Sequence, residues 1–347
     1  MMTSRRLPGR DKVPQFTFAA NAPSANRHGM TTITDRIERE LGIPGLASLL
    51  AERLEPSDMQ SLLLAVYRRL VRRRSTPSLL ADYSRNRFVE PSPISPGEYV
   101  EWDRHAFSAL PHDIQAIELS PLCPLGASAA MAGLEQDRVI STIRNTEVLS
   151  DSTNVLALEA AVRRRALKKG AARSGKPVHL AASHRLVRGQ RYADPRFAQH
   201  FKVFSLCSAG RDGGGFRFEV DALEMHISFY LTTIRDFLGP SVTLDVSLTL
   251  LDAGATLTAA AVALLDKLRE RFGIEAVIDP TRTAGRGYYQ TACFWIHGSS
   301  GEGEKSQLCD GGGVDWTQRL LSDAKERLVI SGVGTDRVCT MRRKRNT

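Results

Sequence analysis

Apolar and polar positions follow a helical period between residues 33 and 74. The apolar residues that recur at spacings of three and four are Leu62, Leu63, Leu64, Val66, Tyr67 and Leu70. Ser57 and Gln60 form a capping-box signature before this run, and the arginines 72–74 suit the negative end of a helix dipole. A proline-rich stretch follows. The pattern predicts a helical extension with its linker over residues 33–98.

From about residue 100 the pattern alternates between helical and strand-like segments. Asp151 to Lys169 and Ala259 to Phe272 have the apolar spacing of amphipathic helices. Strand-like runs are Val242 to Leu251, Gly273 to Ile278, Tyr288 to Ile296 and Val329 to Val333. Helices and strands mixed at this scale predict an α+β fold, in which helices flank an antiparallel sheet.

The composition is that of an ordinary globular chain with room for one large domain or two moderate ones. The 347 residues are 42% apolar and 24% charged. No apolar run reaches the ~20 residues of a membrane span and no secretory signal is evident, so we expect a cytoplasmic protein without a membrane partner. The five cysteines are dispersed, which favours reduced thiols. No spacing typical of metal ligands occurs, so the sequence identifies no metal ligand.

The positive charge is concentrated at the two ends of the chain. The net charge is +9, from 47 basic and 38 acidic residues. Residues 1–30 and 336–347 each contribute five basic residues and one acidic residue, or +4, which leaves +1 for residues 31–335. This distribution predicts a disordered tail over residues 1–32 and a basic tail over 341–347. It argues against a folded nucleic-acid-binding face.

One segment combines arginines with aromatic rings on both sides of a proline loop. A strand, loop and strand would place Arg188 and Gln190 on one face, because side chains alternate along a strand. Arg196 then lies in the loop, and His200 and Lys202 share a face of the returning strand. Guanidinium groups bind phosphates in two-point contacts, and rings stack on bases. The segment is therefore either a nucleotide site or an ordinary surface hairpin.

Two glycine-rich segments lie further along the chain. In one of them, Gly332 and Gly334 precede Arg337 where a strand passes into a helix, so that a ligand can approach the backbone. The other holds a Gly-Tyr-Tyr segment and, after it, the glycine run 311–313. On their own, these segments are typical of glycine-rich turns around a core strand.

Taken in order, the motifs resemble the catalytic core of class II aminoacyl-tRNA synthetases. The order is D-x-T, R-x-Q with R and F following, D-P-x(6)-G-Y-Y, G-G-G-x-D and G-x-G-x-D-R. Within that class the chain is most similar to histidyl-tRNA synthetase and its paralogue, the regulatory subunit of ATP phosphoribosyltransferase. The resemblance implies a core over residues 99–340 that binds ATP, Mg²⁺ and an amino acid. It also implies a homodimer, with Ile117 to Pro124 as the candidate interface strand.

The second class II motif supplies the first set of candidate ATP-binding residues. By resemblance, Arg188 holds the α-phosphate of ATP, and Gln190 stands where the family has glutamate. Arg196 matches the basic loop residue. The family's adenine-stacking phenylalanine falls on His200 by direct count, or on Phe201 if the loop carries one extra residue.

The third class II motif supplies a second phosphate-binding arginine. Arg337 matches the family residue that binds the distal phosphates. Asp336 takes the place of the usual glutamate, and Gly332 and Gly334 are the preceding glycines. The resemblance therefore makes Arg188 and Arg337 the candidate catalytic residues.

The amino-acid site is retained in part. Asp151 and Thr153 match the family's Glu-x-Thr pair, which receives the α-ammonium group of the substrate. Tyr288 and Tyr289 match the paired tyrosines beside the side-chain pocket, and Gly312 lies in the glycine turn expected after them. A carboxylate makes charge-assisted hydrogen bonds to an amine, so a substrate with an amino group fits this pattern.

Several positions depart from the family pattern. Ala284 stands where the family has an arginine that contacts the substrate carboxylate and the α-phosphate, and Arg282 or Arg286 is a candidate substitute. Lys202 replaces a glutamine near the amino group, and Leu206 falls where a glutamate would bind imidazole. An unpaired imidazole N–H would cost ~1–3 kcal/mol, so we expect a substrate other than histidine.

These residues predict an ATP-dependent ligase that activates an amino acid as an acyl-adenylate. The chain ends ten residues after Arg337, so we expect no anticodon-binding domain. The acyl acceptor stays open between an amine, a carrier protein and a tRNA fragment. The alternative is a non-catalytic regulatory subunit that senses an amino acid or a nucleotide for a partner enzyme.

Overall fold

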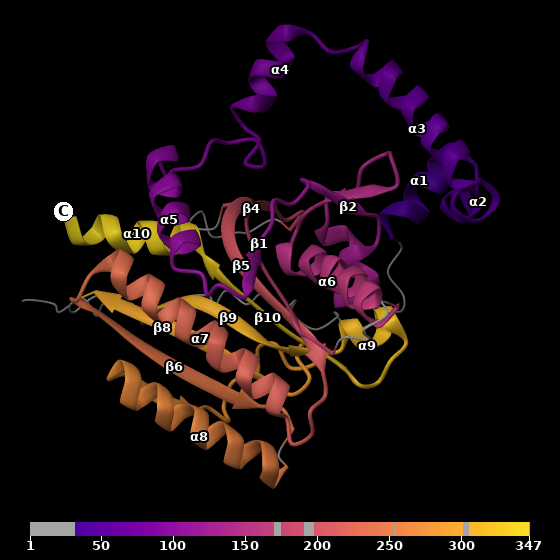
Figure 1. Cartoon of the computed structure of the whole chain (residues 1–347). Coiled ribbons are helices and arrows are strands. Elements are labelled where there is room, and N and C mark those ends of the chain that lie inside the picture. Colours follow the sequence, from indigo (N-terminus) through magenta and orange to yellow (C-terminus); the bar gives the residue numbers. More distant parts are fainter. Residues whose placement is uncertain (1–31, 170–174, 191–197, 253, 301–304, 347) are drawn as a thin grey trace, which may run out of the picture.

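An eight-stranded sheet forms the centre of the molecule (Figure 1), in the order β1-β4-β5-β10-β9-β8-β6-β7. The computed structural model describes residues 32–169, 175–190, 198–252, 254–300 and 305–346. The strands are β1 (Ile114–Ala116), β4 (Val178–Val187), β5 (His200–Arg211), β6 (Val242–Leu250), β7 (Glu275–Ile278), β8 (Ala292–Ser300), β9 (Ser306–Val314) and β10 (Glu326–Gly334). The outer pairs β1–β4 and β6–β7 are parallel, and the other pairs are antiparallel. The predicted α+β fold with an antiparallel sheet is confirmed. The tail predicted over residues 1–32 lies outside the described residues except for its last one.

Helices cover both faces of the sheet and create two hydrophobic cores. One face packs against α5 (Pro96–Ser108), α7 (Arg217–Leu238) and α8 (Ala255–Phe272). The other packs against α6 (Ser152–Lys169) and α9 (Trp316–Leu321), with the small pair β2 (Leu122–Pro124) and β3 (Thr146–Val148) beside it. Side chains alternate along β5 and contribute to both cores. Phe204 and Leu206 point to the α7 side, and Val203 and Cys207 point to the α6 side.

The strongly periodic segments fold as their patterns predict, and the glycine-rich segment differs. The predicted helices are α6 and α8, with α8 beginning at Ala255. The strand predicted from Tyr288 begins only at Ala292, because the N–H groups of Tyr288 and Tyr289 both donate to the carbonyl of Gly285 in a turn. Glycines 311–313 were expected to form a turn and instead lie within β9. The sheet is so tightly packed there that a Cβ atom at Gly311 would lie 2.4 Å from the Cβ of Ser331.

The N-terminal extension is helical, as the periodicity predicts. It consists of α1 (Ile33–Leu41), α2 (Leu46–Arg53), α3 (Pro56–Val71) and α4 (Thr76–Tyr83). The predicted capping box is wrong, because α3 begins at Pro56 with Glu55 as its N-cap and no side-chain cap bond. Proline is favoured at the first helical position, because the N–H group that it lacks would have no partner there and its fixed φ angle suits a helix. In the described part of the chain, no helix is long and apolar enough to cross a membrane.

The basic C-terminal segment is part of a helix, which corrects the expected tail. Helix α10 (Thr335–Asn346) packs against α5. Arg342 Nη1 lies 2.7 Å from Glu101 Oε2, and Arg343 Nε donates to Glu98 Oε1 at 2.6 Å. The Arg343 guanidinium lowers the pKa of Glu98 to about 2. Acidic residues of α5 thus neutralise the charges that the sequence distribution assigned to a tail.

A buried ion pair fastens α6 to the sheet. Arg164 on α6 donates from Nε and Nη2 to the carboxylate of Glu326 on β10, both at 3.0 Å, and both side chains are buried. Lys168 lies 2.8 Å from the same carboxylate. Burial alone would raise the pKa of Glu326, but the hydrogen bonds from Arg164 and Lys168 outweigh it and hold the pKa below its usual value. The pair therefore fixes the helix that carries Asp151 at its entrance.

Removing one partner of this pair should destabilise the protein strongly. We expect Arg164→Met to lower the free energy of unfolding by about 3 kcal/mol, because it leaves buried carboxylate charge incompletely compensated. The matched control is Arg163→Met, whose partly exposed i,i+4 pair with Glu159 should contribute less than about 1 kcal/mol. Urea denaturation measures both values. Equal losses in the two variants would contradict the assigned role of the buried pair.

Candidate functional site

Arg188 and Phe201 lie together on the α6 side of the sheet. Arg188 directly follows β4, and its Nε is 3.5 Å from the carbonyl oxygen of Ser150. Its guanidinium carbon lies 5.1 Å from the centroid of the Phe201 ring at the start of β5. A cationic group beside an aromatic face is an arrangement that can hold a phosphate next to a stacked base.

The direction of the side chains decides the register of the returning strand. His200 points to the other side of the sheet, where its Nδ1 is 2.8 Å from Arg185 Nη1 and its Nε2 is 2.6 Å from the carbonyl of Glu90. His200 therefore does not share a face of the sheet with Arg188, whereas the Phe201 ring lies against the Arg188 guanidinium.

The alternation of side chains along β5 also decides where two other predicted residues lie. Lys202 points to the α5 side and forms an ion pair with Asp103, so it is not near the amino-acid site. Leu206 also lies on the α7 side, whereas Val203 and Cys207 lie on the α6 side with Phe201. Neither Val203 nor Cys207 is a strong hydrogen-bond acceptor.

Asp151 and Thr153 form a compact acceptor group at the start of α6. Asp151 Oδ1 accepts hydrogen bonds from the N–H of Thr153 at 2.9 Å and from its hydroxyl at 2.7 Å. Burial raises the pKa of Asp151, and the Arg188 guanidinium is the main influence in the opposite direction. Because burial disfavours its charged form, the Asp151 carboxylate would be stabilised by a cationic partner such as an ammonium group.

The paired tyrosines lie beside this carboxylate. The rings of Tyr288 and Tyr289 meet edge to face at 4.9 Å between centroids. Burial and the negative charges of Asp151 and Asp310 raise the pKa of Tyr288, so its phenol stays protonated. Gly312 is needed for packing, because a Cβ atom there would lie 2.7 Å from the Tyr289 ring. The site thus combines an anionic end with an aromatic wall.

Arg337 approaches the same region from the start of α10. Its Nη1 donates to the carbonyl of Gln307 at 2.6 Å. Burial and the nearby Arg188 guanidinium lower the pKa of Arg337 to about 10. Two guanidinium groups held within reach of each other repel, and an anion placed between them would relieve that repulsion. The structure therefore brings together the two arginines that the motifs single out.

Three other residues of the third motif have supporting positions. Asp336 points to the α5 side and accepts hydrogen bonds from the Tyr99 hydroxyl at 2.8 Å and the Lys202 N–H at 2.7 Å. It anchors α10 and is not positioned to bind a nucleotide, which corrects that prediction. Gly332 lies opposite Asp310 in the sheet, and Gly334 precedes the helix that carries Arg337.

The two arginines near Ala284 have different surroundings. Arg282 is fully buried, donates to Asp310 Oδ1 at 2.9 Å, and lies 4.0 Å from the centroid of the Trp295 ring. Arg286 is exposed and donates to the backbone carbonyl of Arg282 at 2.9 Å. Of these two guanidinium groups, only that of Arg286 is accessible to a ligand. Asp310 was missed by sequence reasoning, although it directly precedes the glycine run.

The loop between β4 and β5 holds two further predicted residues. β4 ends at Val187, so strand alternation does not place Gln190 on the face of Arg188. Gln190 is half-buried beyond Gly189, whose N–H donates to the carbonyl of Arg138 at 2.9 Å. Arg196 lies outside the described residues. In the described part of the chain, no group of three or more His, Cys, Asp or Glu residues could hold a metal ion.

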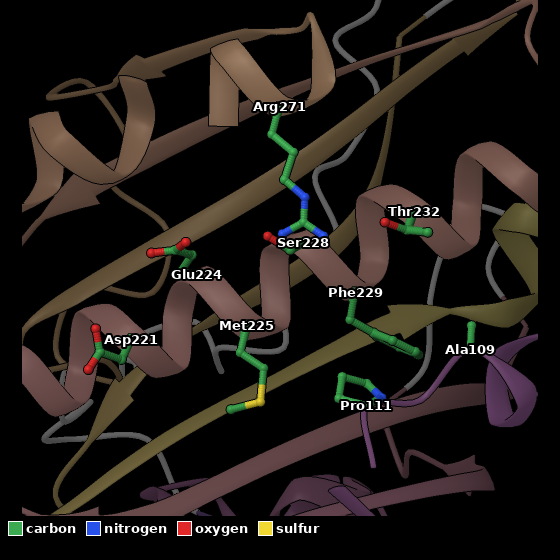
Figure 2. Close-up of a pocket in the computed structure, with 9 residues that line it drawn as sticks. All are labelled: Ala109, Pro111, Asp221, Glu224, Met225, Ser228, Phe229, Thr232 and Arg271. Carbon is green, nitrogen blue, oxygen red and sulfur yellow. The ribbon is translucent and has the colours of Figure 1, made fainter. Parts of the chain in front are cut away.

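A groove of about 510 Å³ lies on the other face of the sheet (Figure 2). It runs beside α7, where Met225 and Phe229 give it an apolar floor. Arg271 from α8 and Pro111 from the loop after α5 line its edges. None of the residues predicted for nucleotide or amino-acid binding lines this groove.

Solved structures of class II aminoacyl-tRNA synthetases have a similar fold. Apo histidyl-tRNA synthetase from S. aureus aligns with a TM-score of 0.53 and 13% identity, over 74% of this chain and 69% of that one. An ATP phosphoribosyltransferase regulatory subunit/histidyl-tRNA synthetase from Bacillus halodurans aligns with a TM-score of 0.53 and 14% identity, over 73% and 82%. A putative threonyl-tRNA synthetase from Aeropyrum pernix aligns with a TM-score of 0.55 and 10% identity, over 72% and 59%.

These similarities show the fold and do not select a substrate. The predicted class II synthetase-like architecture is confirmed. Histidyl- and threonyl-tRNA synthetases align equally well, so the backbone does not distinguish their amino acids. No family model matches the sequence, and a search of curated proteins finds no significant match.

The closeness of Arg188 and Asp151 can be tested by titration. We expect Arg188→Met to raise the pKa of Asp151 further, because it removes the main influence that favours the carboxylate. The control is Arg185→Met, on the opposite side of β4, which should leave that pKa unchanged. Carbon-13 NMR of the aspartate side chains measures it.

The sign of the effect on stability follows from the same titration. The folded-state pKa of Asp151 lies above the unfolded value, so the folded protein binds the proton more tightly. This group's contribution to stability therefore falls as the pH rises between the two pKa values. An Asp151 pKa that is the same in the wild type and in Arg188→Met would show that the two side chains do not interact.

Proposed function

We propose that the chain is an ATP-dependent ligase that activates the carboxyl group of an amino acid as an acyl-adenylate. The closeness of Arg188 to Arg337 carries this proposal, because burial and, after it, the Arg188 charge lower the pKa of Arg337. Phe201 supplies a stacking surface beside Arg188, and Asp151 supplies an acceptor for an amine. A triphosphate and an amino acid can therefore be held next to each other.

The reaction needs a carboxylate and a phosphate to approach although both are negative. A carboxylate oxygen of the amino acid attacks the α-phosphorus of ATP, and the bond from that phosphorus to the bridging oxygen of the β-phosphate breaks. The products are the acyl-adenylate and pyrophosphate. Arg188 would hold the α-phosphate and Arg337 the distal phosphates, so that the growing charge meets fixed cations. Asp151 and Thr153 would hold the ammonium group.

Mg²⁺ fits this arrangement as an ion carried by the nucleotide. The described residues contain no group that could hold a metal ion by protein ligands alone, and Mg²⁺ is commonly bound through phosphates and water. When bound, it neutralises part of the triphosphate charge. The chain's own part is to position the α-phosphate with Arg188 and the distal phosphates with Arg337.

The substrate we propose carries an amino group and is not histidine. Asp151 is a buried acceptor, Tyr288 lies near it, and Tyr289 meets Tyr288 edge to face. Neither tyrosine carries a carboxylate, which is the acceptor that the family provides for an imidazole N–H. Arg286, the accessible arginine near Ala284, is the proposed contact for the substrate carboxylate. An amine, a carrier protein or a tRNA remains the proposed class of acyl acceptor, and a homodimer the proposed assembly.

A non-catalytic sensor of amino acids or nucleotides is the alternative. Ala284 favours it, because the family arginine at this position contacts the reacting groups. The Arg282–Asp310 pair also favours it, since the nearest buried guanidinium is neutralised by a protein carboxylate. The two arginines assigned to the phosphates favour the ligase over a sensor of amino acids alone, which needs no such pair.

Removal of the distal arginine tests the phosphate assignment. We expect Arg337→Ala to abolish detectable ATP binding in isothermal titration calorimetry and to lower pyrophosphate exchange by on the order of 10²–10³, since one charge that stabilises the transition state is lost. The matched control is Arg342→Ala, five residues further along α10, whose partner is Glu101. Unchanged ATP affinity in Arg337→Ala would refute the assignment. ATP binding without exchange for any amino acid would favour the sensor.

The strand register gives an independent test of the base-binding surface. We expect Phe201→Ala to weaken ATP binding by on the order of tenfold, because stacking on an aromatic ring contributes ~1–3 kcal/mol per base. His200→Ala should leave ATP affinity unchanged, since His200 points to the other side of the sheet. The same calorimetric titration measures both. Weaker ATP binding in His200→Ala with unchanged binding in Phe201→Ala would contradict the proposal that Phe201 stacks on the base.

A further inference from the structure

Residues 33–90, which we name the arm, form a helical segment that leaves its apolar side chains uncovered. Figure 1 shows α1 to α4 arching outside the body formed by the sheet and its helices. No residue of the arm is buried. It nevertheless holds two thirds of the exposed large apolar side chains in the described chain. Such a surface marks an interaction site.

Three of the four helices of the arm are too short to be stable without a partner. α1, α2 and α4 have nine, eight and eight residues. Isolated helices below ~12–15 residues are marginal in water, and most helical stability in proteins comes from packing an apolar face. The longest helix, α3, carries an apolar stripe of Leu62, Val66 and Leu70 at i, i+4 and i+8, each at least 41% exposed. This stripe is the natural place for a packing partner.

The charge of the arm is divided into two halves of opposite sign. Residues 33–58 hold three basic and six acidic residues, a net charge of −3. Residues 59–90 hold seven basic and two acidic residues, a net charge of +5. The exposed arginines Arg68, Arg69, Arg72 and Arg73 form no ion pair within the described residues. The boundary between the two halves, at residues 58 and 59, lies in the first turn of α3, just before the apolar stripe.

We propose that the arm binds the arm of a second copy of this chain, antiparallel and about a two-fold axis near the middle of α3. In that arrangement the acidic half of each arm lies against the basic half of the other, and the two α3 stripes cover each other. A two-fold interface must be self-complementary, and a surface with opposite charges on either side of an apolar centre meets this condition. The contact is separate from the interface strand 117–124 that the family resemblance implies.

Electron paramagnetic resonance distances between labelled copies test this pairing in the full chain. A nitroxide on Ser61→Cys, beside the stripe, should report a distance between copies of roughly 20–30 Å, which is the 8–10 Å separation of packed helix axes with label linkers and offset added. The five native cysteines are buried, so they should not take the label. Val262→Cys, exposed on α8, is the control and should not give this distance. Absence of the short distance at Ser61→Cys would overturn the proposal.

Charge reversal tests whether complementarity holds the arms together. Arg69→Glu, Arg72→Glu and Arg73→Glu in one chain should abolish the short distance, and so should Glu52→Arg, Glu55→Arg and Asp58→Arg in another. The chain with all six changes has the two signs exchanged, so the short distance should return. Recovery also shows that the reversed helices still fold. Persistence of the distance in both partial variants, or failure to recover in the combined one, would overturn the proposal.

Discussion

The candidate site depends on two guanidinium groups being held near each other on one side of a sheet. Like charges at short range repel unless an anion lies between them, and the lowered pKa of Arg337 reflects this repulsion together with burial. The two arginines are far apart in the sequence, one after β4 and one at the start of α10. They lie near each other because β5 lies between β4 and β10 in the sheet. The end of β4 and the end of β10 both pair with the start of β5.

Contacts on both faces of the sheet keep this arrangement in place. Asp336 accepts hydrogen bonds from the Tyr99 hydroxyl and the Lys202 N–H. These bonds hold the start of α10, and with it the backbone of Arg337, on the sheet. Arg164 and Glu326 tie α6 to β10, which keeps Asp151 at the same side of the sheet. Asp336, which the sequence motifs suggest as a ligand, thus holds the backbone in place.

Periodicity predicts the helices and most of the strands well, because local spacing of apolar residues is the main signal for both. It fails where tertiary packing decides, as at glycines 311–313, which form part of a strand pressed against Phe294 and Ser331. The motif order points to Arg188, Arg337 and Asp151, but counting along the sequence does not decide whether His200 or Phe201 shares a face with Arg188. Side-chain direction is a property of the sheet, so only the structure assigns it. Asp310 escapes prediction because its partner, Arg282, is distant in the sequence.

The most direct test of the account is hydrogen–deuterium exchange of the full chain with and without ATP and Mg²⁺. We predict slower exchange at the end of β4, the start of β5 and the first turn of α10, where Arg188, Phe201 and Arg337 lie. The groove beside α7 should not change. No protection at these three segments, or protection confined to that groove, would contradict the claim that one side of the sheet binds the triphosphate.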